Sequence, residues 1–282
     1  MKKILLFGKN GKLGSAIEEV FSKDYSVFGL SSKDCDVCNF KKVKQLIKKI
    51  KPKIVINATV FGGIKLCEKN PYKAFLINSL FPRFLAKLSR IENFLLVHFS
   101  SDAVFGDSKK KFFVETDEPF LKNIYGATKY VGDCFVQAEA KNYYILRMSV
   151  LFGKTTKTTQ FIDKALKMLM EGKKIINIYG DFVFSPTYSL DVAWQLKKLI
   201  EEKFPFGLYH IANSGKATFA EILNKIISNL NLKAKVQKVL TEVSDDDFSR
   251  PVVLRSIKLK PQRSWKAALN DYCNKIKKAF KL

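Results

Sequence analysis

The stretch of sequence that decides the fold runs Ile4-Leu-Leu-Phe7 and then Gly8-Lys-Asn-Gly11-Lys-Leu-Gly14. Its first four residues are all apolar, which is the pattern of a short strand buried on both faces of a parallel sheet. The glycines have GxxGxxG spacing, which lets a tight turn bring the backbone close to a pyrophosphate and lets the next helix pack against the strand. The helical pattern of Ser15–Phe21 follows, and its N-terminus would offer free N–H groups to the phosphates. We therefore expect a dinucleotide-binding turn, and an ordinary glycine-rich loop is the weaker alternative.

The rest of the first half alternates between apolar runs and amphipathic segments. Strand patterns lie at Tyr25–Leu30, Ile54–Ala58, Phe94–Phe99 and Tyr143–Met148, and helical patterns lie at Val43–Ile50, Tyr72–Ser89 and Ile124–Ala140. Repeated strand–helix alternation is typical of a parallel sheet covered on both faces. The sequence thus predicts an α/β fold: a Rossmann-type parallel sheet with helices on both faces and a smaller C-terminal lobe.

After about residue 150 the alternation is less regular. Helical patterns lie at Phe161–Glu171, Leu190–Glu202, Thr218–Asn229 and Ser264–Leu282, and strand patterns at Gly207–Ile211 and Lys235–Leu240. Thr218 and Glu221 have the spacing of a capping box at a helix start. We expect residues 1–150 to form the dinucleotide-binding domain. Residues 151–282 should form mostly a substrate-binding lobe, with segments that interleave back onto the first domain.

Composition bounds the class of protein. A chain of 282 residues with 47% hydrophobic content can bury a large core. The formal net charge of +24 comes from lysines spread along the whole chain. The simplest explanation of this charge is a set of lysine-rich helix faces in contact with water. The next is that positive potential steers anionic ligands such as nucleotides to the protein. A nucleic-acid partner is the weakest explanation, and we do not expect one. No apolar run approaches the roughly 18 residues of a membrane span.

The five cysteines are scattered along the chain. Free thiols in a reducing cytoplasm are the simplest explanation, so we expect a cytoplasmic protein. Cys35 and Cys38 have CxxC spacing, but the chain has only two histidines, His98 and His210, to complete a zinc site. No metal site is expected.

The end of the second predicted strand bears on the choice of cofactor. An acidic residue at its tip favours NAD through the ribose hydroxyls. Here the strand ends Leu30-Ser31-Ser32-Lys33, and Ser and Lys side chains could hold a 2′-phosphate. Asp34 lies past the expected tip. The sequence favours NADP(H), with NAD(H) left open.

Three polar residues have an order and spacing suited to carbonyl reduction. Ser101 follows the strand pattern of Phe94–Phe99, and Tyr125 and Lys129, four residues apart, share one helix face. A nearby ammonium lowers a phenol pKa from about 10, so Tyr125 could exchange a proton with a substrate oxygen that Ser101 also contacts. Tyr and Lys at this spacing are common on solvated helices. Their place after the glycine turn is what makes this pair significant.

These motifs together resemble the extended short-chain dehydrogenases/reductases, and more narrowly the dTDP-4-dehydrorhamnose reductase family. The resemblance covers nearly the whole chain. Its pieces are Gly8–Gly14, Asn57-Ala-Thr, Glu68-Lys-Asn-Pro71, Asn78, Ser100-Ser-Asp-Ala-Val-Phe-Gly106, Glu115-Thr-Asp117, Tyr125-Gly-Ala-Thr-Lys129, Arg147-Met-Ser-Val-Leu-Phe-Gly153, Ser185-Pro-Thr-Tyr188 and Arg250-Pro251.

In that family a nicotinamide cofactor delivers hydride to C4 of a 4-keto-6-deoxy sugar carried on a nucleoside diphosphate, for the synthesis of surface-polysaccharide sugars. The resemblance implies Tyr125 as the proton donor, Lys129 as the residue that tunes it and binds the nicotinamide ribose, and Ser101 in a place usually held by Thr. It implies cofactor contacts from Gly8, Asn10, Gly11, Lys12, Leu13, Gly14, Ser31, Ser32, Asp36, Val37, Ala58, Thr59, Ser100, Tyr125 and Lys129.

Substrate contacts are expected from Asp102, Ser149, Val150 and Arg250. The Arg250 guanidinium could pair with the diphosphate of the sugar nucleotide or, equally, form a surface ion pair with Asp245–Asp247. Two departures from the family pattern, Ala103 in place of Tyr and Val150 in place of Trp, border the sugar and leave its identity and the nucleotide open.

Two other functions stay open. A nucleotide-sugar 4-epimerase is one, because Ser100–Gly106 approaches the epimerase pattern, and a catalytically idle regulatory subunit on the same fold is the other. Ala103 lacks the Glu that follows Asp in the sugar-nucleotide dehydratases, and Asp102 stands where the GDP-fucose synthase group has Cys. Assembly as a homodimer is also left open.

Overall fold

The computed structural model describes residues 1–106, 110–154, 160–179, 182–239 and 251–280, and a parallel sheet lies at its centre. The sheet has six strands in the order β2-β1-β3-β4-β5-β9, and every neighbouring pair is parallel. The strands are β1 (Lys3–Phe7), β2 (Ser26–Leu30), β3 (Ile54–Asn57), β4 (Leu95–Ser101), β5 (Tyr143–Met148) and β9 (Gly207–His210). The predicted fold class is confirmed.

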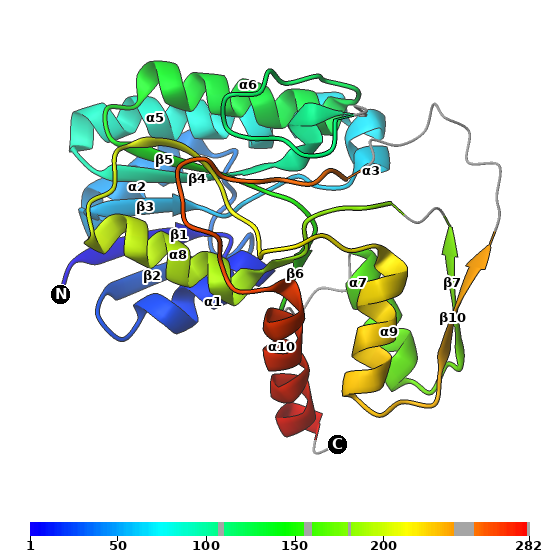
Figure 1. Cartoon of the computed structure of the whole chain (residues 1–282). Coiled ribbons are helices and arrows are strands. Elements are labelled where there is room, and N and C mark those ends of the chain that lie inside the picture. Colours follow the sequence, from blue (N-terminus) through cyan, green and yellow to red (C-terminus); the bar gives the residue numbers. More distant parts are fainter. Residues whose placement is uncertain (107–109, 155–159, 180–181, 240–250, 281–282) are drawn as a thin grey trace.

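Helices cover both faces of this sheet (Figure 1). On one face lie α1 (Lys12–Phe21) and α8 (Ser189–Glu201), and on the other lie α2 (Phe40–Ile50), α5 (Phe81–Glu92) and α6 (Ile124–Glu139). Successive side chains of a strand point to opposite faces of the sheet, so each strand contributes to the core on both faces. In β1, Ile4 and Leu6 enter the core beneath α1 and α8, whereas Leu5 and Phe7 enter the core beneath α2 and α5.

The sheet reverses its order of construction beside β1. The chain passes from β1 to β2 on one side and then crosses to β3 on the other, so β1 and β3 are neighbours at a topological switch point. In open α/β sheets, ligands bind outside the carboxyl ends of the strands at such a point. The glycine turn after β1 and the residues after β3 therefore lie where a ligand is expected.

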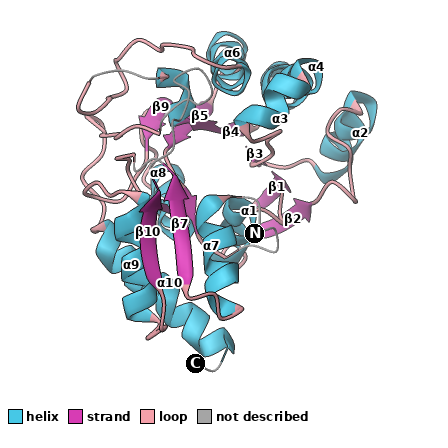
Figure 2. Cartoon of the chain, turned by 90° about the vertical axis from the view of Figure 1, so that its right-hand side faces the viewer, coloured by secondary structure: helices cyan, strands magenta, loops and turns pink. Residues whose placement is uncertain are grey.

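A second core forms the C-terminal lobe, which we define as α7 (Phe161–Met170), α9 (Phe219–Asn229), α10 (Trp265–Phe280) and the parallel pair β7 (Ile175–Tyr179) and β10 (Lys235–Val239). Figure 2 shows the two strands side by side with the lobe's helices behind them. The expected capping box at the start of α9 is present, with Thr218 and Glu221 bonded to each other's backbone. A short parallel pair, β6 (Leu151–Phe152) and β8 (Thr187–Tyr188), lies between the lobe and the sheet.

The helix expected over Tyr72–Ser89 is present, but a π-helical turn lies inside it. The continuous helical run consists of α4 (Pro71–Phe75), the π-helical turn (Leu76–Leu80) and α5, and a short α3 (Ile64–Lys69) precedes it. Pro82 follows the π-helical turn directly and has no N–H to donate back into it, while the Phe81 N–H donates to the Leu76 carbonyl. The polar side chains of the π turn contact α6, since Ser79 Oγ donates to the Thr128 carbonyl at 2.7 Å. Packing against α6 thus accompanies a π-helical turn within a continuous helix, which the apolar period did not indicate.

The other differences are small or lie at element ends. Helix α1 starts at Lys12 rather than at Ser15, because Gly11 is its N-cap. The strand β7 was not predicted. The predicted strand up to Leu240 ends at Val239 in the described part of the chain, and the predicted final helix is described as far as Phe280.

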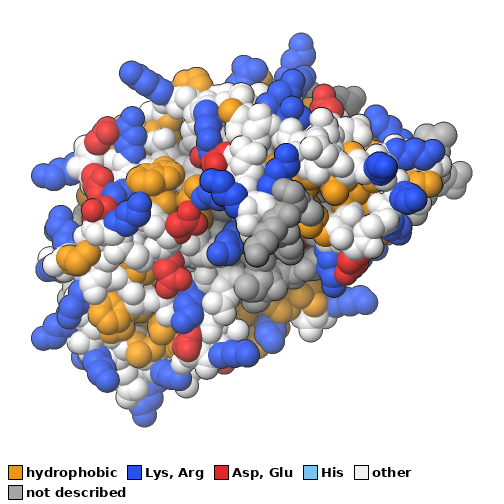
Figure 3. Space-filling model, turned by 90° about the horizontal axis from the view of Figure 1, so that it is seen from below, with side chains coloured by type: hydrophobic (Ala, Val, Ile, Leu, Met, Phe, Trp, Pro, Cys, Tyr) orange, Lys and Arg blue, Asp and Glu red, His pale blue; other side chains and the backbone are white. Residues whose placement is uncertain are grey.

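Positive charge is dispersed over the face of the molecule shown in Figure 3, where Lys and Arg side chains alternate with acidic and apolar ones. None of the helices in the described ranges is long and apolar enough to cross a membrane.

Candidate active site

The glycine turn is closed so tightly that side chains do not fit. Gly8 has φ +89°, and a Cβ there would lie 2.6 Å from the Ala58 carbonyl oxygen. A Cβ on Gly14 would overlap the Gly8 carbonyl. The Gly8 and Lys9 N–H groups donate to the Leu30 carbonyl at 2.8 and 3.1 Å. The turn therefore joins the ends of β1, β2 and β3, and α1 begins there with N–H groups available to an anion.

Among the other predicted residues of this turn, Asn10 is exposed and Leu13 packs into the core beneath α1. Lys12 is different: its side chain is buried and contacts Asp163 at 2.5 Å and Gln160 at 2.6 Å, both at the start of α7. Burial lowers the pKa of Lys12, while the Asp163 carboxylate opposes that shift. The spacing of the sequence carried no signal of this contact.

At the end of β2, Ser31 is buried and Ser32 is exposed. The Ser31 N–H and hydroxyl donate to Asp34 Oδ2 at 2.8 and 2.7 Å, and Lys9 Nζ lies 3.5 Å from the same oxygen. Asp36 is exposed and accepts a hydrogen bond from the Cys38 N–H, while Val37 is partly buried beneath α2.

At the end of β3, a buried amide holds the backbone in place. Asn57 Oδ1 accepts from the N–H and hydroxyl of Thr59 at 3.2 and 2.6 Å, and its amide nitrogen lies 3.3 Å from His98 Nδ1. Ala58 and Thr59 are partly exposed beside the glycine turn. The structure thus brings the expected cofactor residues of β1 and β3 together.

The predicted catalytic residues also meet. Ser101 is the last residue of β4, and its hydroxyl lies close enough to the Tyr125 side chain on α6 to affect the pKa of that phenol. The Ser101 hydroxyl itself donates to Asp102 Oδ1 at 3.1 Å. Lys129, one turn further along α6, is buried and donates from Nζ to the Phe99 carbonyl at 2.6 Å. Burial lowers the pKa of Lys129 to about 8, which the Asp133 carboxylate partly opposes.

The expected lowering of the Tyr125 pKa is not found. Burial raises the pKa of Tyr125 to about 12, the neighbouring Ser101 hydroxyl lowers it in part, and the nearby Asp102 carboxylate raises it further. Lys129 Nζ is directed to the Phe99 carbonyl. Tyr125 therefore holds its proton at neutral pH and is suited to donate it.

A buried polar network supports the catalytic helix. The Asp133 carboxylate accepts from the Ser100 hydroxyl at 2.9 Å and from Arg147 Nε at 3.0 Å, and His98 Nε2 lies 3.6 Å away. Burial holds the pKa of His98 well below its ordinary value. Ser100, expected to contact the cofactor, thus has its hydroxyl bonded to Asp133. The sequence analysis missed Asp133, although its position four residues after Lys129 places it on the same helix face.

Two of the expected substrate residues contact each other. Ser149 Oγ donates to Asp102 Oδ2 at 2.7 Å, and the Val252 N–H donates to the same oxygen at 3.2 Å. Both side chains are buried. Val150 is partly buried against the core of the C-terminal lobe. Arg250 and its alternative partners Asp245–Asp247 lie outside the described residues.

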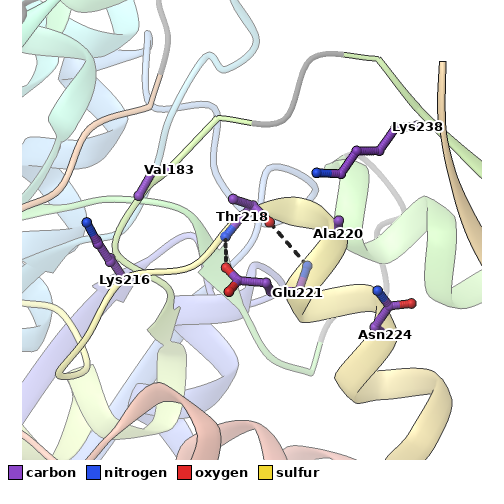
Figure 4. Close-up of a pocket in the computed structure, with 7 residues that line it drawn as sticks. All are labelled: Val183, Lys216, Thr218, Ala220, Glu221, Asn224 and Lys238. Carbon is purple, nitrogen blue, oxygen red and sulfur yellow. Dashed lines mark hydrogen bonds between the residues drawn. The ribbon is translucent and has the colours of Figure 1, made fainter. Parts of the chain in front are cut away.

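A hollow of about 500 Å³ lies elsewhere, on the C-terminal lobe at the start of α9 (Figure 4). Its lining includes Thr218, Glu221 and Lys238 but none of the Ser, Tyr and Lys described above. We place the candidate site at the carboxyl ends of the strands because the polar groups converge there. Within the described ranges, no three His, Cys, Asp or Glu side chains gather as a metal site would require.

The parallel sheet, the closed glycine turn and the meeting of Ser101, Tyr125 and Lys129 are together those of a short-chain dehydrogenase/reductase. The family model described as RmlD substrate binding domain matches residues 1–278, and the chain belongs to this family.

Similar proteins agree with this membership. The chain is 29% identical over 280 residues to the spore coat polysaccharide biosynthesis protein SpsK of Bacillus subtilis, covering 96% of this chain and 97% of that protein. It is 27% identical over 250 residues to a dTDP-4-dehydrorhamnose reductase of Aggregatibacter actinomycetemcomitans, covering 86% and 83%. Among solved structures, the dTDP-4-dehydrorhamnose reductase of Bacillus anthracis in complex with NADP matches with a TM-score of 0.90 and 29% identity over 98% of this chain and 100% of that chain.

Proposed function

We propose that this protein is an NADPH-dependent reductase of a nucleotide-linked 4-keto-6-deoxy sugar, acting in the synthesis of a surface polysaccharide. The observation that carries the proposal is that Ser101 at the end of β4 lies beside Tyr125 on α6, with the buried Lys129 one turn further along that helix. Membership in the RmlD substrate binding domain family and the names of the relatives support this substrate class.

The residues present fit a dinucleotide. The two tight glycines leave the backbone bare where a pyrophosphate would approach, and the start of α1 offers N–H groups there. Gly11, Lys12 and Leu13 would hold the phosphates through their backbone, and Ala58 and Thr59 would line the cleft. When bound, the cofactor supplies the hydride.

The protein's own groups handle the proton and the position of the carbonyl. Tyr125 donates its proton to the oxygen at C4 of the sugar, and Ser101 hydrogen-bonds to the same oxygen. Lys129 adds positive charge beside the developing alkoxide when it is protonated. Asp133, Ser100 and Arg147 hold the helix face that carries Lys129.

Cofactor choice rests on two observations. The relative from Bacillus anthracis was solved with NADP, and beside the end of β2 Ser31 and Lys9 supply hydrogen-bond donors and a positive charge, which the Asp34 carboxylate engages in this structure. We propose NADP(H) as the preferred cofactor. Asp102, Ser149, Val150 and Arg250 remain the proposed substrate contacts, with the diphosphate on Arg250.

The test is reduction of sugar nucleotides in vitro. Purified protein is mixed with NADPH or NADH and with 4-keto-6-deoxy sugars on dTDP, UDP or GDP, and loss of reduced cofactor is followed by absorbance. We expect oxidation with one of these substrates, and a rate at least about 100-fold lower for Tyr125→Phe. Tyr72→Phe, which changes an exposed tyrosine, is the matched control.

Two outcomes would contradict the proposal. Interconversion of sugar nucleotides at C4 with no net loss of cofactor would identify an epimerase. Cofactor binding without turnover of any substrate would identify an idle subunit.

A further inference from the structure

Lys12 joins the glycine turn to the C-terminal lobe. It is the first residue of α1, so its backbone lies where phosphates are expected, while its side chain runs to the start of α7. There Nζ contacts Asp163 at 2.5 Å and Gln160 at 2.6 Å. The side chains of Lys12 and Asp163 are each only 7% exposed, so water screens this ion pair little.

The far end of the contact is well fixed. Asp163 and Gln160 form the capping box of α7, and Gln160 N–H donates to the same Asp163 oxygen that Lys12 contacts. The positive end of a helix dipole repels a cation, so the ammonium of Lys12 would be destabilised at the start of α7 by itself. The Asp163 carboxylate stabilises it there. The opposite side of α7 packs Ile162 and Leu169 into the core of the lobe.

Two further polar contacts that α1 makes on the side of the lobe are exposed. Lys275 Nζ on α10 contacts Glu19 at 2.9 Å with both side chains about half exposed, and Ser15 Oγ reaches the Lys154 carbonyl at 3.2 Å at the surface. Exposed pairs contribute little and are screened by salt. The buried Lys12 contact is the stronger mechanical connection between the turn and the lobe.

We propose that Lys12 is a positioning residue that couples occupancy of the dinucleotide turn to the orientation of the substrate lobe. The inference rests on the proposed function. Phosphates bound at the start of α1 would hold the Lys12 backbone in one position. The Lys12 side chain would then hold the start of α7, and α7 is part of the lobe that faces the sugar nucleotide. Bound cofactor should then increase the affinity for the nucleotide part of the substrate. Bound nucleotide must increase the affinity for the cofactor by the same factor.

The experiment measures this coupling by binding rather than by turnover. The Kd of dTDP, with UDP and GDP as alternatives, is measured by titration calorimetry with and without saturating NADP⁺. For the wild type we expect NADP⁺ to lower the Kd of the best nucleotide about 10-fold. For Lys12→Met the ratio should fall to about 1. Asp163→Asn keeps the size and the capping ability of the side chain, and it should also lose most of the effect of NADP⁺ on the nucleotide Kd.

Lys275→Met is the matched control, because it removes the exposed ion pair to the same helix α1 and should leave the ratio unchanged. Thermal unfolding of each variant shows whether it is folded. If Lys12→Met does not fold, the test rests on Asp163→Asn. A wild-type protein that binds both ligands with no coupling, or a ratio that persists in Lys12→Met and Asp163→Asn, overturns this inference alone. A wild-type protein that binds neither NADP⁺ nor any of the nucleotides overturns the proposed function and this inference with it.

Discussion

The Asp34 carboxylate occupies the hydrogen-bond donors that Ser31 presents at the end of β2. One oxygen, Oδ2, accepts from both the Ser31 N–H and its hydroxyl at 2.8 and 2.7 Å, and Lys9 Nζ lies 3.5 Å from it. These hydrogen bonds hold the pKa of Asp34 at about 2. The same donors are those that a 2′-phosphate would need. We therefore expect Asp34 to compete with the 2′-phosphate of NADP(H) if Ser31 and Ser32 hold it.

Replacing Asp34 should therefore increase the preference for NADPH. For Asp34→Ser we expect the KM for NADPH to fall about fivefold, because an exposed competing charge is removed, and the KM for NADH to rise or stay the same. Steady-state kinetics with both cofactors provide the ratio. Asp24→Ala, which removes an exposed carboxylate before the other end of β2, should leave it unchanged. An unaltered ratio in Asp34→Ser would show that the 2′-phosphate binds elsewhere.

Lys129 should set the alkaline limit of activity. Its pKa is lowered to about 8 and that of Tyr125 is raised to about 12, so Lys129 loses its proton first as pH rises. If the ammonium stabilises the developing alkoxide, kcat/KM should fall above about pH 8 with a single-proton dependence. In Lys129→Arg, whose guanidinium stays charged, the fall should move to higher pH. The hypothesis fails if the two pH profiles have the same alkaline limb.

The same shift predicts how stability depends on pH. Lys129 has a lower pKa in the folded state than its ordinary value of 10.5, so between about pH 8 and 10.5 the unfolded state binds more protons. The Lys129 contribution to the free energy of unfolding should therefore rise with pH across this window and level off above it, by about 3 kcal/mol in total. Urea unfolding of wild type and Lys129→Met at several pH values measures the difference. A difference that does not change with pH would argue against the lowered pKa of Lys129 in the folded state.

The sequence predicts best where local pattern and tertiary role coincide. Residues Ile4–Phe7 of β1 are all apolar because both faces of the strand are buried there, and Tyr125 and Lys129 share a helix face because helical geometry places them there. The network around Asp133 carried the same four-residue signal and could have been found. The contact of Lys12 with Asp163 could not, because 151 residues separate the two and only the packing of the lobe brings them together.

The missed strand β7 and the π turn have a related cause. β7 pairs with β10, which lies far along the chain, so turn residues between neighbouring strands gave no indication of it. The period over Tyr72–Ser89 was helical, and the turn departs from it where Asn78 and Ser79 contact α6. In both places a long-range partner decides the local structure.

Gly132 allows α6 to lie against this π turn. A Cβ on Gly132 would overlap the Asn78 backbone carbonyl, so α6 would have to move. We expect Gly132→Ala to lower the free energy of unfolding by about 1–3 kcal/mol, as for other overpacked sites, and to lower kcat because the same helix carries Tyr125. Gly62→Ala is the control, because a Cβ there meets only Val60 side-chain atoms at 3.6 Å or more. Equal stability of the two variants would contradict the close approach.

Ser149 donates a hydrogen bond to the buried Asp102 and so favours its charged form. Burial raises the pKa of Asp102, and the hydrogen bonds from Ser149 and Val252 lower it in part. The folded-state pKa lies above the ordinary value, so charging Asp102 costs stability as pH rises through that range. Loss of the Ser149 donor should increase this cost. We expect Ser149→Ala to be destabilised by about 1–3 kcal/mol at pH 7 and by less near pH 4, where the carboxyl can protonate.

Ser185→Ala separates this effect from simple loss of a hydrogen bond. Ser185 Oγ bonds only to the N–H and carbonyl of Leu254, at 3.0 and 3.2 Å, among the bonds found for it in the described chain. No carboxylate is involved, so its loss should cost the same at pH 4 and pH 7. Chemical denaturation at pH 4 and pH 7 gives the free energy of unfolding of the wild type, Ser149→Ala and Ser185→Ala. If the deficit of Ser149→Ala is as independent of pH as that of Ser185→Ala, then Asp102 is already protonated at neutral pH, and it would meet the sugar as a hydrogen-bond donor rather than as a carboxylate.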